Sequence, residues 1–383
     1  ELKYLNAISE DFAKEETKAL LKNIKHAGVL AGVPSTVKDC ICVKGVESTA
    51  GSAVLKGYKP LFNATSVQRL IDSGSIIFGK TSQDEFGFGS FNTNVGVGYD
   101  IPLNPFDKTR VCGGSSGGSA GFVQKIDMPN FSLAESTGGS IVAPASFCGV
   151  VGICPTYGRV SRYGLMDYAN SLDKIGPITK TVEDGALVLD AVSGYDPKDS
   201  TSVLTNNQNN NFSSFIGRDI KGLKVAIISD LFGEGTDSSV SKIVLDKLDG
   251  INYDKVTLPL NNKIALEAYY IIAMCEASTN LAKYCGMRYG AHEKLEGNFN
   301  EYFADVRSKW VGAEAKRRII IGTFARMAGY RDAYYIKAMK VRTKLIEEYK
   351  KVFSNYDVII SPTMPVIAPR FDEIKKLTPL QSY

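Results

Sequence analysis

Glycine and serine are concentrated in two short segments, CGGSSGGSA at residues 112–120 and STGGS at residues 136–140. So much glycine is not expected inside a helix or strand, and both segments are therefore predicted to be loops. Around them, short apolar runs such as 75–79 and 358–361 alternate with stretches of helical period. This alternation predicts an α/β architecture that carries two glycine-rich loops.

Other segments complete the predicted organisation. Helices and a further buried strand are expected, in chain order, at 11–26, 67–73, 223–232 (the strand), 264–286 and 313–353. The polar run NNQNNN at 206–211 is the candidate for a boundary or an insertion.

The composition excludes several classes of protein. The two histidines, His26 and His292, lie near no motif, so a histidine-dependent triad or a histidine-rich metal site is not expected. The seven cysteines include no CxxC pair and are interpreted as reduced thiols. The 45 basic and 41 acidic residues are too evenly balanced to indicate nucleic acid by charge. No apolar run is long enough to predict a membrane span.

One segment, GSIIFGKT at 74–81, fits the phosphate-loop pattern GxxxxGK[ST] letter for letter. A phosphate loop follows a strand and presents backbone N–H groups to the anion. Here the four variable positions themselves have the character of a buried strand, and the residues before Gly74 have helical character. A nucleotide-binding site at Lys80 is therefore a minor alternative.

Three segments together indicate hydrolytic chemistry: GVPSTVKD at 32–39, GGSSGGSA at 113–120 and STGGSIVAPASFCGVVG at 136–152. A serine nucleophile needs a base, and without a usable histidine the candidates are Asp, Glu and Lys. Lys38 follows an apolar-biased run, and a buried lysine can serve as a base where its surroundings favour the neutral amine. The glycines before Ser140 can turn backbone N–H groups towards a developing oxyanion.

These segments, in this order, resemble the amidase signature family, whose members are amide hydrolases with a Ser–cis-Ser–Lys triad. The motif core covers about residues 32–178, and the resemblance continues to the end of the chain. It implies one domain over residues 1–383, trimmed at both ends, with a large mixed β-sheet covered by helices on both faces. Within the family, residues 155–184, 269–290 and 316–342 resemble the A subunits of tRNA-dependent amidotransferases.

The resemblance assigns roles residue by residue. Lys38 matches the catalytic lysine, Ser115 matches the bridging serine that follows a cis peptide bond after Gly114, and Ser140 matches the acylated nucleophile. The remaining matches are the oxyanion-hole residues Thr137, Gly138 and Gly139 and the substrate-binding residues Tyr269 and Arg318.

The activity implied by the resemblance is a glutaminase that supplies ammonia to convert Glu-tRNA(Gln) or Asp-tRNA(Asn) to Gln-tRNA or Asn-tRNA. No metal or cofactor is implied in this chain, and ATP and Mg²⁺ are expected at the partner subunit. The expected partners are glutamine and the B and C subunits of a hetero-oligomer, with tRNA bound mainly by the partner and no membrane contact. The expected location is the cytoplasm or an organelle matrix.

The chain departs from the family pattern beside the motifs. Ser136 stands where an acidic residue is usual, with Glu135 one place earlier, and Val142 stands where an arginine is usual. An aspartate that binds the glutamine amino group is expected shortly beyond Tyr383. These features keep open a catalytically silent scaffold subunit. A stand-alone amidase is also open, although Arg318 favours a substrate with a carboxylate.

Overall fold

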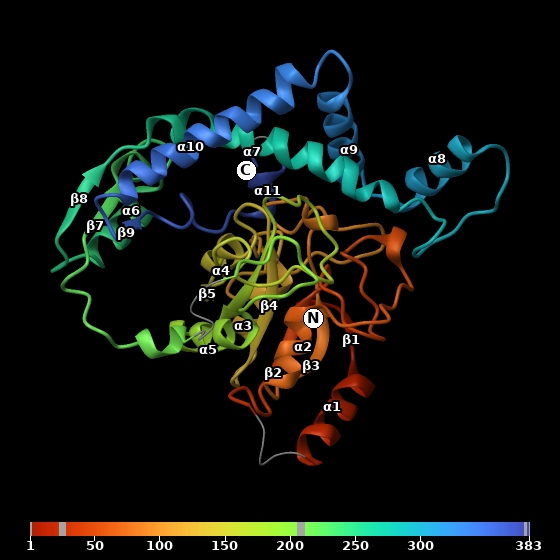
Figure 1. Cartoon of the computed structure of the whole chain (residues 1–383), viewed down its shortest axis with the longest axis horizontal. Coiled ribbons are helices and arrows are strands. Elements are labelled where there is room, and N and C mark those ends of the chain that lie inside the picture. The colour runs from red at the N-terminus through yellow and green to blue at the C-terminus, as the bar shows by residue number, and fades with distance from the viewer. Residues whose placement is uncertain (1, 23–27, 205–210, 379–380, 383) are drawn as a thin grey trace.

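The structure is a computed structural model that describes residues 2–22, 28–204, 211–378 and 381–382 (Figure 1). Its main sheet has six strands in the order β1-β3-β2-β4-β6-β5. Their bounds in chain order are Leu5–Ile8 for β1, Pro34–Lys38 for β2, Ile76–Thr81 for β3, Phe131–Ser136 for β4, Val151–Gly152 for β5 and Lys174–Thr179 for β6.

The main sheet is mixed. Strand β2 lies between β3 and β4 and is parallel to both, whereas β1, β6 and β5 pair in antiparallel fashion. Because parallel strands end at the same edge of a sheet, the residues that follow β2, β3 and β4 are brought together there.

Helices cover both faces of the main sheet, as the resemblance implies. Alternate residues of a strand point to opposite faces, and in β4 Leu133 and Ala134 belong to two different apolar clusters. Leu133 packs in the cluster that includes apolar side chains of α2 (Thr65–Asp72) and α5 (Val182–Val192). Ala134 packs in the cluster that includes α3 (Gly117–Lys125) and the residues around α4 (Val142–Phe147).

A second sheet of three parallel strands has the order β8-β7-β9. Its strands are β7 (Val225–Ile228), β8 (Tyr253–Val256) and β9 (Val358–Ile360), and Figure 1 places them to the left of the main sheet. The predicted α/β fold is thus confirmed, but its strands are divided between two sheets. The single-domain assignment stays a prediction.

The second half of the chain is mainly helical. In Figure 1, α7, α9 and α10 form an arch above the main sheet, and α8 projects to one side. The remaining helices, in chain order, are α1 (Glu10–Lys22), α6 (Ser238–Asp246), α7 (Pro259–Asn280), α8 (Phe299–Trp310), α9 (Ala313–Arg326), α10 (Lys337–Phe353) and α11 (Phe371–Ile374). The predicted helical stretch 313–353 is thus interrupted, with a π-helical turn at Asp332–Ile336.

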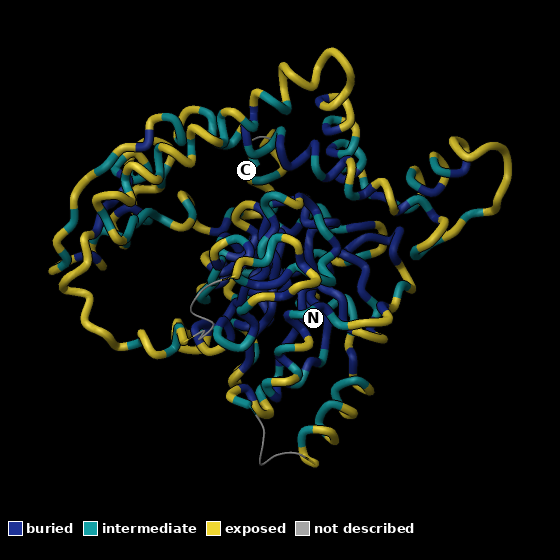
Figure 2. The backbone as a smooth tube through the Cα atoms, in the orientation of Figure 1, coloured by how far each residue is buried: buried dark blue, intermediate teal, exposed yellow. Residues whose placement is uncertain are grey.

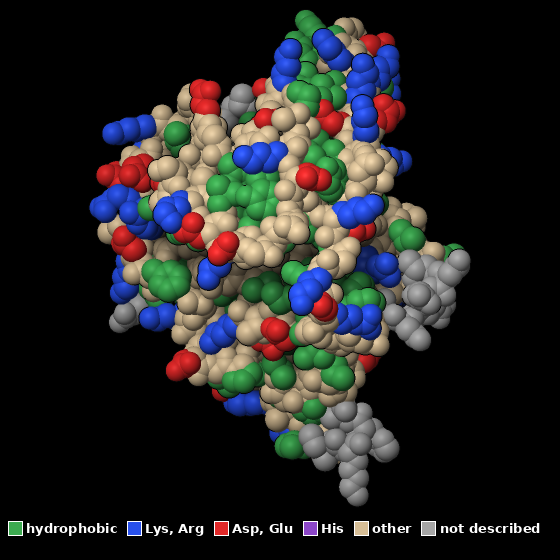
Figure 3. Space-filling model, turned by 90° about the vertical axis from the view of Figure 1, so that its left-hand side faces the viewer, with side chains coloured by type: hydrophobic (Ala, Val, Ile, Leu, Met, Phe, Trp, Pro, Cys, Tyr) green, Lys and Arg blue, Asp and Glu red, His purple; other side chains and the backbone are tan. Residues whose placement is uncertain are grey.

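Burial is concentrated in the main sheet and the loops above it, whereas the arch and α8 are largely exposed or intermediate (Figure 2). On the face drawn in Figure 3, positive and negative side chains are interspersed, and the densest group of Lys and Arg lies at the top. No helix among the described residues is long and apolar enough to span a membrane.

The structure corrects one sequence prediction and decides another. The glycine-rich segment 112–120 is not entirely a loop, because α3 begins at Gly117 and its first residues are buried.

The phosphate-loop match at 74–81 is strand β3, and Lys80 is fully buried there. Lys80 Nζ donates to the backbone oxygen of Ile41 at 2.6 Å, so it does not face an open anion site. The predicted boundary at 206–211 lies almost wholly outside the described residues.

Candidate active site

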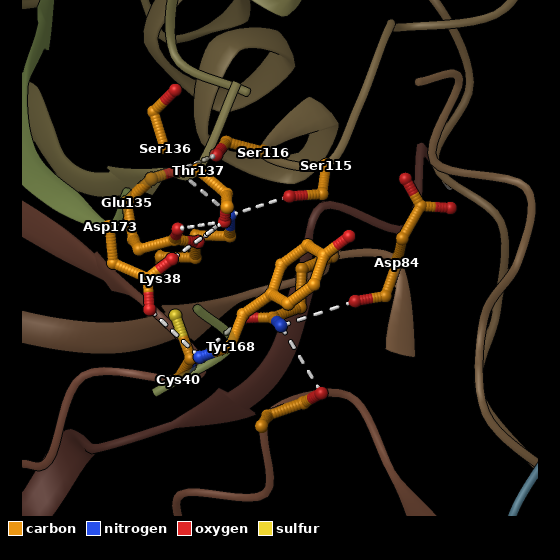
Figure 4. Close-up of polar contacts among 12 residues, drawn as sticks. Lys38, Cys40, Asp84, Ser115, Ser116, Glu135, Ser136, Thr137, Tyr168 and Asp173 are labelled. Carbon is orange, nitrogen blue, oxygen red and sulfur yellow. Dashed lines mark hydrogen bonds and ion pairs between the residues drawn. The ribbon is translucent and has the colours of Figure 1, made fainter. Parts of the chain in front are cut away.

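The candidate site lies at the edge of the main sheet where β2 and β4 end (Figure 4). Lys38 is the last residue of β2, and Glu135 is the second-to-last residue of β4. Ser115 and Ser116 come directly before α3, which packs against β4. The sheet and one helix therefore bring together residues that are far apart in the sequence.

Lys38 is fully buried and its amino group makes three hydrogen bonds. Nζ donates to Ser115 Oγ at 2.7 Å, to the backbone oxygen of Glu135 at 2.9 Å and to Glu135 Oε2 at 2.8 Å. An ammonium group has three donors, and here each donor has an acceptor. The predicted pairing of Lys38 with Ser115 is confirmed as a contact.

The peptide bond between Gly114 and Ser115 is cis, as the resemblance implies. The loop around it is fixed by backbone bonds: Gly114 N–H donates to Ser90 O at 2.7 Å and Asp84 N–H donates to Ser115 O at 3.2 Å. A Cβ on Gly114 would lie 2.3 Å from Asp84 Oδ2, so only glycine fits this position. Burial raises the pKa of Asp84 to about 6.

A chain of polar side chains leads away from Lys38. Glu135 and Asp173 are both buried, and Thr137 Oγ1 lies 2.9 Å from Glu135 Oε1 and 2.8 Å from Asp173 Oδ1. Burial, followed by the charge of Glu135, raises the pKa of Asp173 well above its usual range. Asp173 Oδ2 accepts N–H bonds from Tyr168 at 2.8 Å and Ala169 at 2.9 Å. The side chain of Ser136 points away from Lys38 (Figure 4).

A cavity of about 400 Å³ opens over the turn between β4 and α4. Gly138, Gly139, Ser140, Tyr269 and Gly114 are among the residues that line it. Within the described part of the chain, no acceptor is bonded to the backbone N–H groups of Gly138, Gly139 or Ser140. These N–H groups are therefore available to an oxyanion formed in the cavity.

Ser140 and Ser115 are not in contact in this structure. Among the described residues, no hydrogen bond joins their hydroxyl groups, and Ser140 lines the cavity beside Gly114. Catalytic hydrogen bonds are often formed only when the substrate is bound. The structure thus brings Lys38 and Ser115 together and places Ser140 nearby. The assigned roles of all three residues stay a prediction.

The two predicted substrate residues are placed differently. Tyr269, on α7, lines the cavity, and its hydroxyl approaches Gly138 so closely that a Cβ there would lie 3.0 Å away. Arg318, on α9, is fully buried and is not among the cavity-lining residues. Arg318 donates to Glu314 Oε1 at 2.6 Å and to Tyr168 Oη at 2.9 Å. Tyr168 is hydrogen-bonded to Tyr269, so Arg318 is linked to the cavity through two tyrosines.

Sequence reasoning missed the polar residues that surround the Lys38–Ser115 pair. Glu135 stands out in the sequence only as an acidic residue displaced by one position. Tyr168 and Asp173 lie within the segment 155–184 that carries the resemblance, but the resemblance assigned them no role, and Asp84 belongs to no motif. Their proximity depends on contacts between distant segments, such as the pairing of β4 with β6, in which Glu135 lies opposite Ile175. Among the described residues, no group of three or more His, Cys, Asp or Glu side chains is placed to hold a metal ion.

The fold and the site together define a class of protein: an α/β protein with a buried lysine–serine pair beside a glycine-rich turn, an arrangement suited to acyl transfer by serine. Comparison with known proteins identifies the family. The family model described as Amidase matches residues 2–383, and the chain therefore belongs to the amidase family.

Curated relatives and a solved structure match nearly the whole chain. The A subunit of glutamyl-tRNA(Gln) amidotransferase from Geobacillus sp. (strain WCH70) is 46% identical over 376 residues, which are 97% of this chain and 76% of that protein. The protein of the same name from Methanococcoides burtonii is 44% identical over 373 residues, covering 96% of this chain and 77% of the relative. The crystal structure of the same kind of protein from Thermotoga maritima is 35% identical, with a TM-score of 0.75, and the match covers 98% of this chain and 81% of that one.

Proposed function

We propose that this chain is the glutaminase subunit of a tRNA-dependent amidotransferase. The observation that carries the proposal is the buried contact of 2.7 Å between Lys38 Nζ and Ser115 Oγ beside the cavity that Ser140 lines. The choice of glutamine as substrate is supported by the names of the relatives, which are A subunits of glutamyl-tRNA(Gln) amidotransferase.

The proposed reaction is acyl transfer. Lys38, as the neutral amine, takes the proton of Ser115 while Ser115 takes the proton of Ser140. Ser140 Oγ then bonds to the carbonyl carbon of the glutamine side chain, and the N–H groups of the turn bind the resulting oxyanion. The proton returns through Ser115 to the nitrogen, the C–N bond breaks and ammonia leaves. Water attacks the glutamyl ester by the same relay, which releases glutamate and restores Ser140.

Tyr269 and Arg318 are the proposed substrate-binding residues. Tyr269 forms part of the cavity wall, and Arg318 supplies the positive charge that a glutamine α-carboxylate needs. Arg318 already donates hydrogen bonds to Glu314 and Tyr168. The glutamine carboxylate would therefore either be attracted by the charge of Arg318 across Tyr168 and Tyr269, or replace one of these two acceptors and bond to Arg318 directly.

The remaining parts of the proposal concern the assembly. The ammonia is consumed by a B subunit that activates Glu-tRNA(Gln) or Asp-tRNA(Asn) with ATP and Mg²⁺, and a C subunit completes the hetero-oligomer in the cytoplasm or an organelle matrix. This chain itself needs no cofactor for the steps above, since each proton is carried by its own side chains.

The test is ammonia release from glutamine in the complex with the B and C subunits. Ser140→Ala should lower the rate by at least about a thousandfold, because the nucleophile is removed. The matched control is Ser146→Ala, since Ser146 lies on the adjacent helix α4 and is exposed. Equal rates for wild type and Ser140→Ala would refute the proposal.

Two further outcomes separate the alternatives. A rate that does not rise when the partner subunits and charged tRNA are added would favour a stand-alone amidase. Covalent labelling of Ser140 by a glutamine-analogue electrophile, absent in Ser140→Ala, is expected for the glutaminase and contradicts a silent scaffold.

A further inference from the structure

Lys38 Nζ donates to three hydrogen-bond acceptors, and one of the three carries a charge. Ser115 Oγ and the backbone oxygen of Glu135 are neutral, whereas Glu135 Oε2 belongs to a carboxyl group at 2.8 Å. The two side chains of this ion pair are 0% and 4% exposed, so water does not screen them. The Glu135 carboxylate and the Lys38 ammonium group therefore attract each other with little screening by water.

The hydrogen bonds of Thr137 show where the protons lie on Glu135 and Asp173. Thr137 has one hydroxyl proton but lies within hydrogen-bonding distance of two carboxyl groups, those of Glu135 and Asp173. One of these carboxyl groups must therefore supply a proton of its own. Glu135 is paired with Lys38, whereas the bonds that Asp173 Oδ2 accepts from the described residues come from the backbone N–H groups of Tyr168 and Ala169. The proton thus belongs on Asp173, which donates to Thr137, and Thr137 donates to Glu135.

At the end of β4 the side chain that reaches Lys38 is that of Glu135 and not that of its neighbour Ser136. Figure 4 shows Glu135 beside Lys38 and Ser136 directed away from it. Ser136 Oγ instead donates to the backbone oxygen of Gly138 at 3.1 Å, within the turn.

We propose, on the basis of the glutaminase function above, that Glu135 is a positioning residue whose carboxylate holds Lys38 Nζ against Ser115 Oγ and whose negative charge opposes the conversion of Lys38 to the neutral amine. The contact fixes the direction of the amine, because two of its three bonds go to Glu135. The same negative charge favours the ammonium form, which cannot accept a proton. The hydrolysis should therefore have an acid limb in its pH profile, and Glu135 should determine where this limb lies.

Other charged or titratable groups surround the pair but do not contact Lys38 Nζ within the described part of the chain. Asp84 is held by the N–H groups of Asn92 and Asn94, and burial raises the pKa of the Cys40 and Cys154 thiols, which keeps them neutral. The more distant charged groups that act on these neighbours are Asp39, Lys80, Lys174 and Arg318. Glu135 is thus the acid in position to control Lys38.

The experiment is the pH dependence of kcat for ammonia release at saturating glutamine, in the complex with its partner subunits. In Glu135→Gln, which keeps the shape but removes the charge, the acid limb should move to lower pH by on the order of 1–3 units. In Glu135→Asp the limb should move less, while kcat falls because the shorter side chain no longer holds Nζ in place. This second variant keeps the test decisive if Glu135→Gln does not fold.

Two controls isolate the charge at residue 135. Asp173→Asn should leave the limb in place, because Asp173 already carries its proton and an amide can donate to Thr137 in the same way. Glu85→Gln removes another buried acid, whose contacts are Ser52 and Gly312 and not Lys38, and should also leave the limb in place.

The possible results separate this inference from the proposed function. A limb that stays at its wild-type pH in Glu135→Gln and Glu135→Asp, with only a lower rate, would show that Glu135 has a merely structural role. A limb displaced in Asp173→Asn would overturn the proton count. Full activity of Ser140→Ala would instead overturn the glutaminase function itself.

Discussion

At the scale of single residues, Glu85 makes the stability of the protein depend on pH. Its carboxyl group is buried, accepts a hydrogen bond from Ser52 Oγ, and accepts the N–H of Gly312 at 2.8 Å. Burial raises the pKa of Glu85 from its ordinary 4.5 to about 7, although these hydrogen bonds act in the opposite direction. The folded protein therefore holds this proton more tightly than the unfolded chain does.

The sign of the effect follows from proton binding. Below pH 4.5 the carboxyl group is protonated in both states, and above about 7 it is ionised in both, at a cost to the folded state. The free energy of unfolding should thus fall as the pH rises through this window, and Glu85→Gln should remove on the order of 3 kcal/mol of that fall. Asp84, whose pKa burial raises to about 6, should keep part of the dependence in the variant.

Urea unfolding across the window measures this effect. The matched control is Glu10→Gln, at an exposed residue that pairs with Lys14 on the surface of α1. The interpretation of Glu85 would be wrong if the free energy of unfolding fell by the same amount in the variant and the wild type between pH 4.5 and about 7.

The two buried lysines show what residue-level reasoning can and cannot decide. Lys38 could be predicted as functional because three motifs occur together, and the structure confirms its contact with Ser115. Lys80 matches a phosphate-loop pattern, yet its amino group is bonded to Ile41 O, Asp39 O and Ser48 Oγ. A pattern of letters does not report burial, and burial depends on segments distant in the sequence.

At the scale of elements, helix α3 positions Ser115, and its glycines allow it to do so. A Cβ on Gly121 would lie 2.4 Å from the ring of Tyr4, and one on Gly118 would lie 2.5 Å from Ser82 O. Without side chains at these two positions the helix can approach the end of β3 and the N-terminal segment. The glycines thus permit close packing of a helix where the glycine content predicts a loop.

Gly121→Ala should therefore destabilise the protein. In an exposed helix a change from glycine to alanine usually raises the free energy of unfolding by up to about 1 kcal/mol. Here the added methyl group meets a buried ring, which should lower the free energy of unfolding by on the order of 1–3 kcal/mol. Ammonia release should fall as well, because a shift of α3 moves Ser115 away from Lys38. Thermal or urea unfolding measures the first effect. Lys125→Ala, at an exposed position of the same helix, is the control, and a stabilised Gly121→Ala would contradict the packing argument.

Element types were predictable where a local pattern decided them. The apolar runs at 75–79 and 358–361 are strands β3 and β9, and the helical period at 264–286 corresponds to most of α7. The series of contacts Lys38–Glu135–Thr137–Asp173 could not be predicted in this way, since it joins β2, β4 and the segment before β6. The position of Arg318 behind Tyr168 likewise depends on how α9 lies against the segment before β6, which is distant in the sequence.

At the scale of the whole molecule, the two sheets differ in burial. Every residue of β4 is buried, and four of the five residues of β2 are buried. In the second sheet only the central strand β7 is fully buried, whereas β8 and β9 form its edges and have no buried residue. Lys38, Ser115 and Glu135 therefore belong to the better-buried part of the protein, while Tyr269 lies on α7, which follows directly after β8 and the Leu258 cap.

Native-state hydrogen exchange should reveal this difference. Amides in well-buried strands exchange only when much of the protein unfolds, whereas exposed edge strands open locally at lower free energy. The amides of β2 and β4 should therefore be the slowest, those of β7 intermediate, and those of β8 and β9 the fastest among these strands. The edge strand β1, which has no buried residue, serves as the internal control for edge position within the main sheet. Low concentrations of urea should accelerate exchange in β8 and β9 before β4, while the Lys38–Ser115 contact persists. Equal protection in β4, β8 and β9 would mean that the two sheets unfold as one cooperative unit.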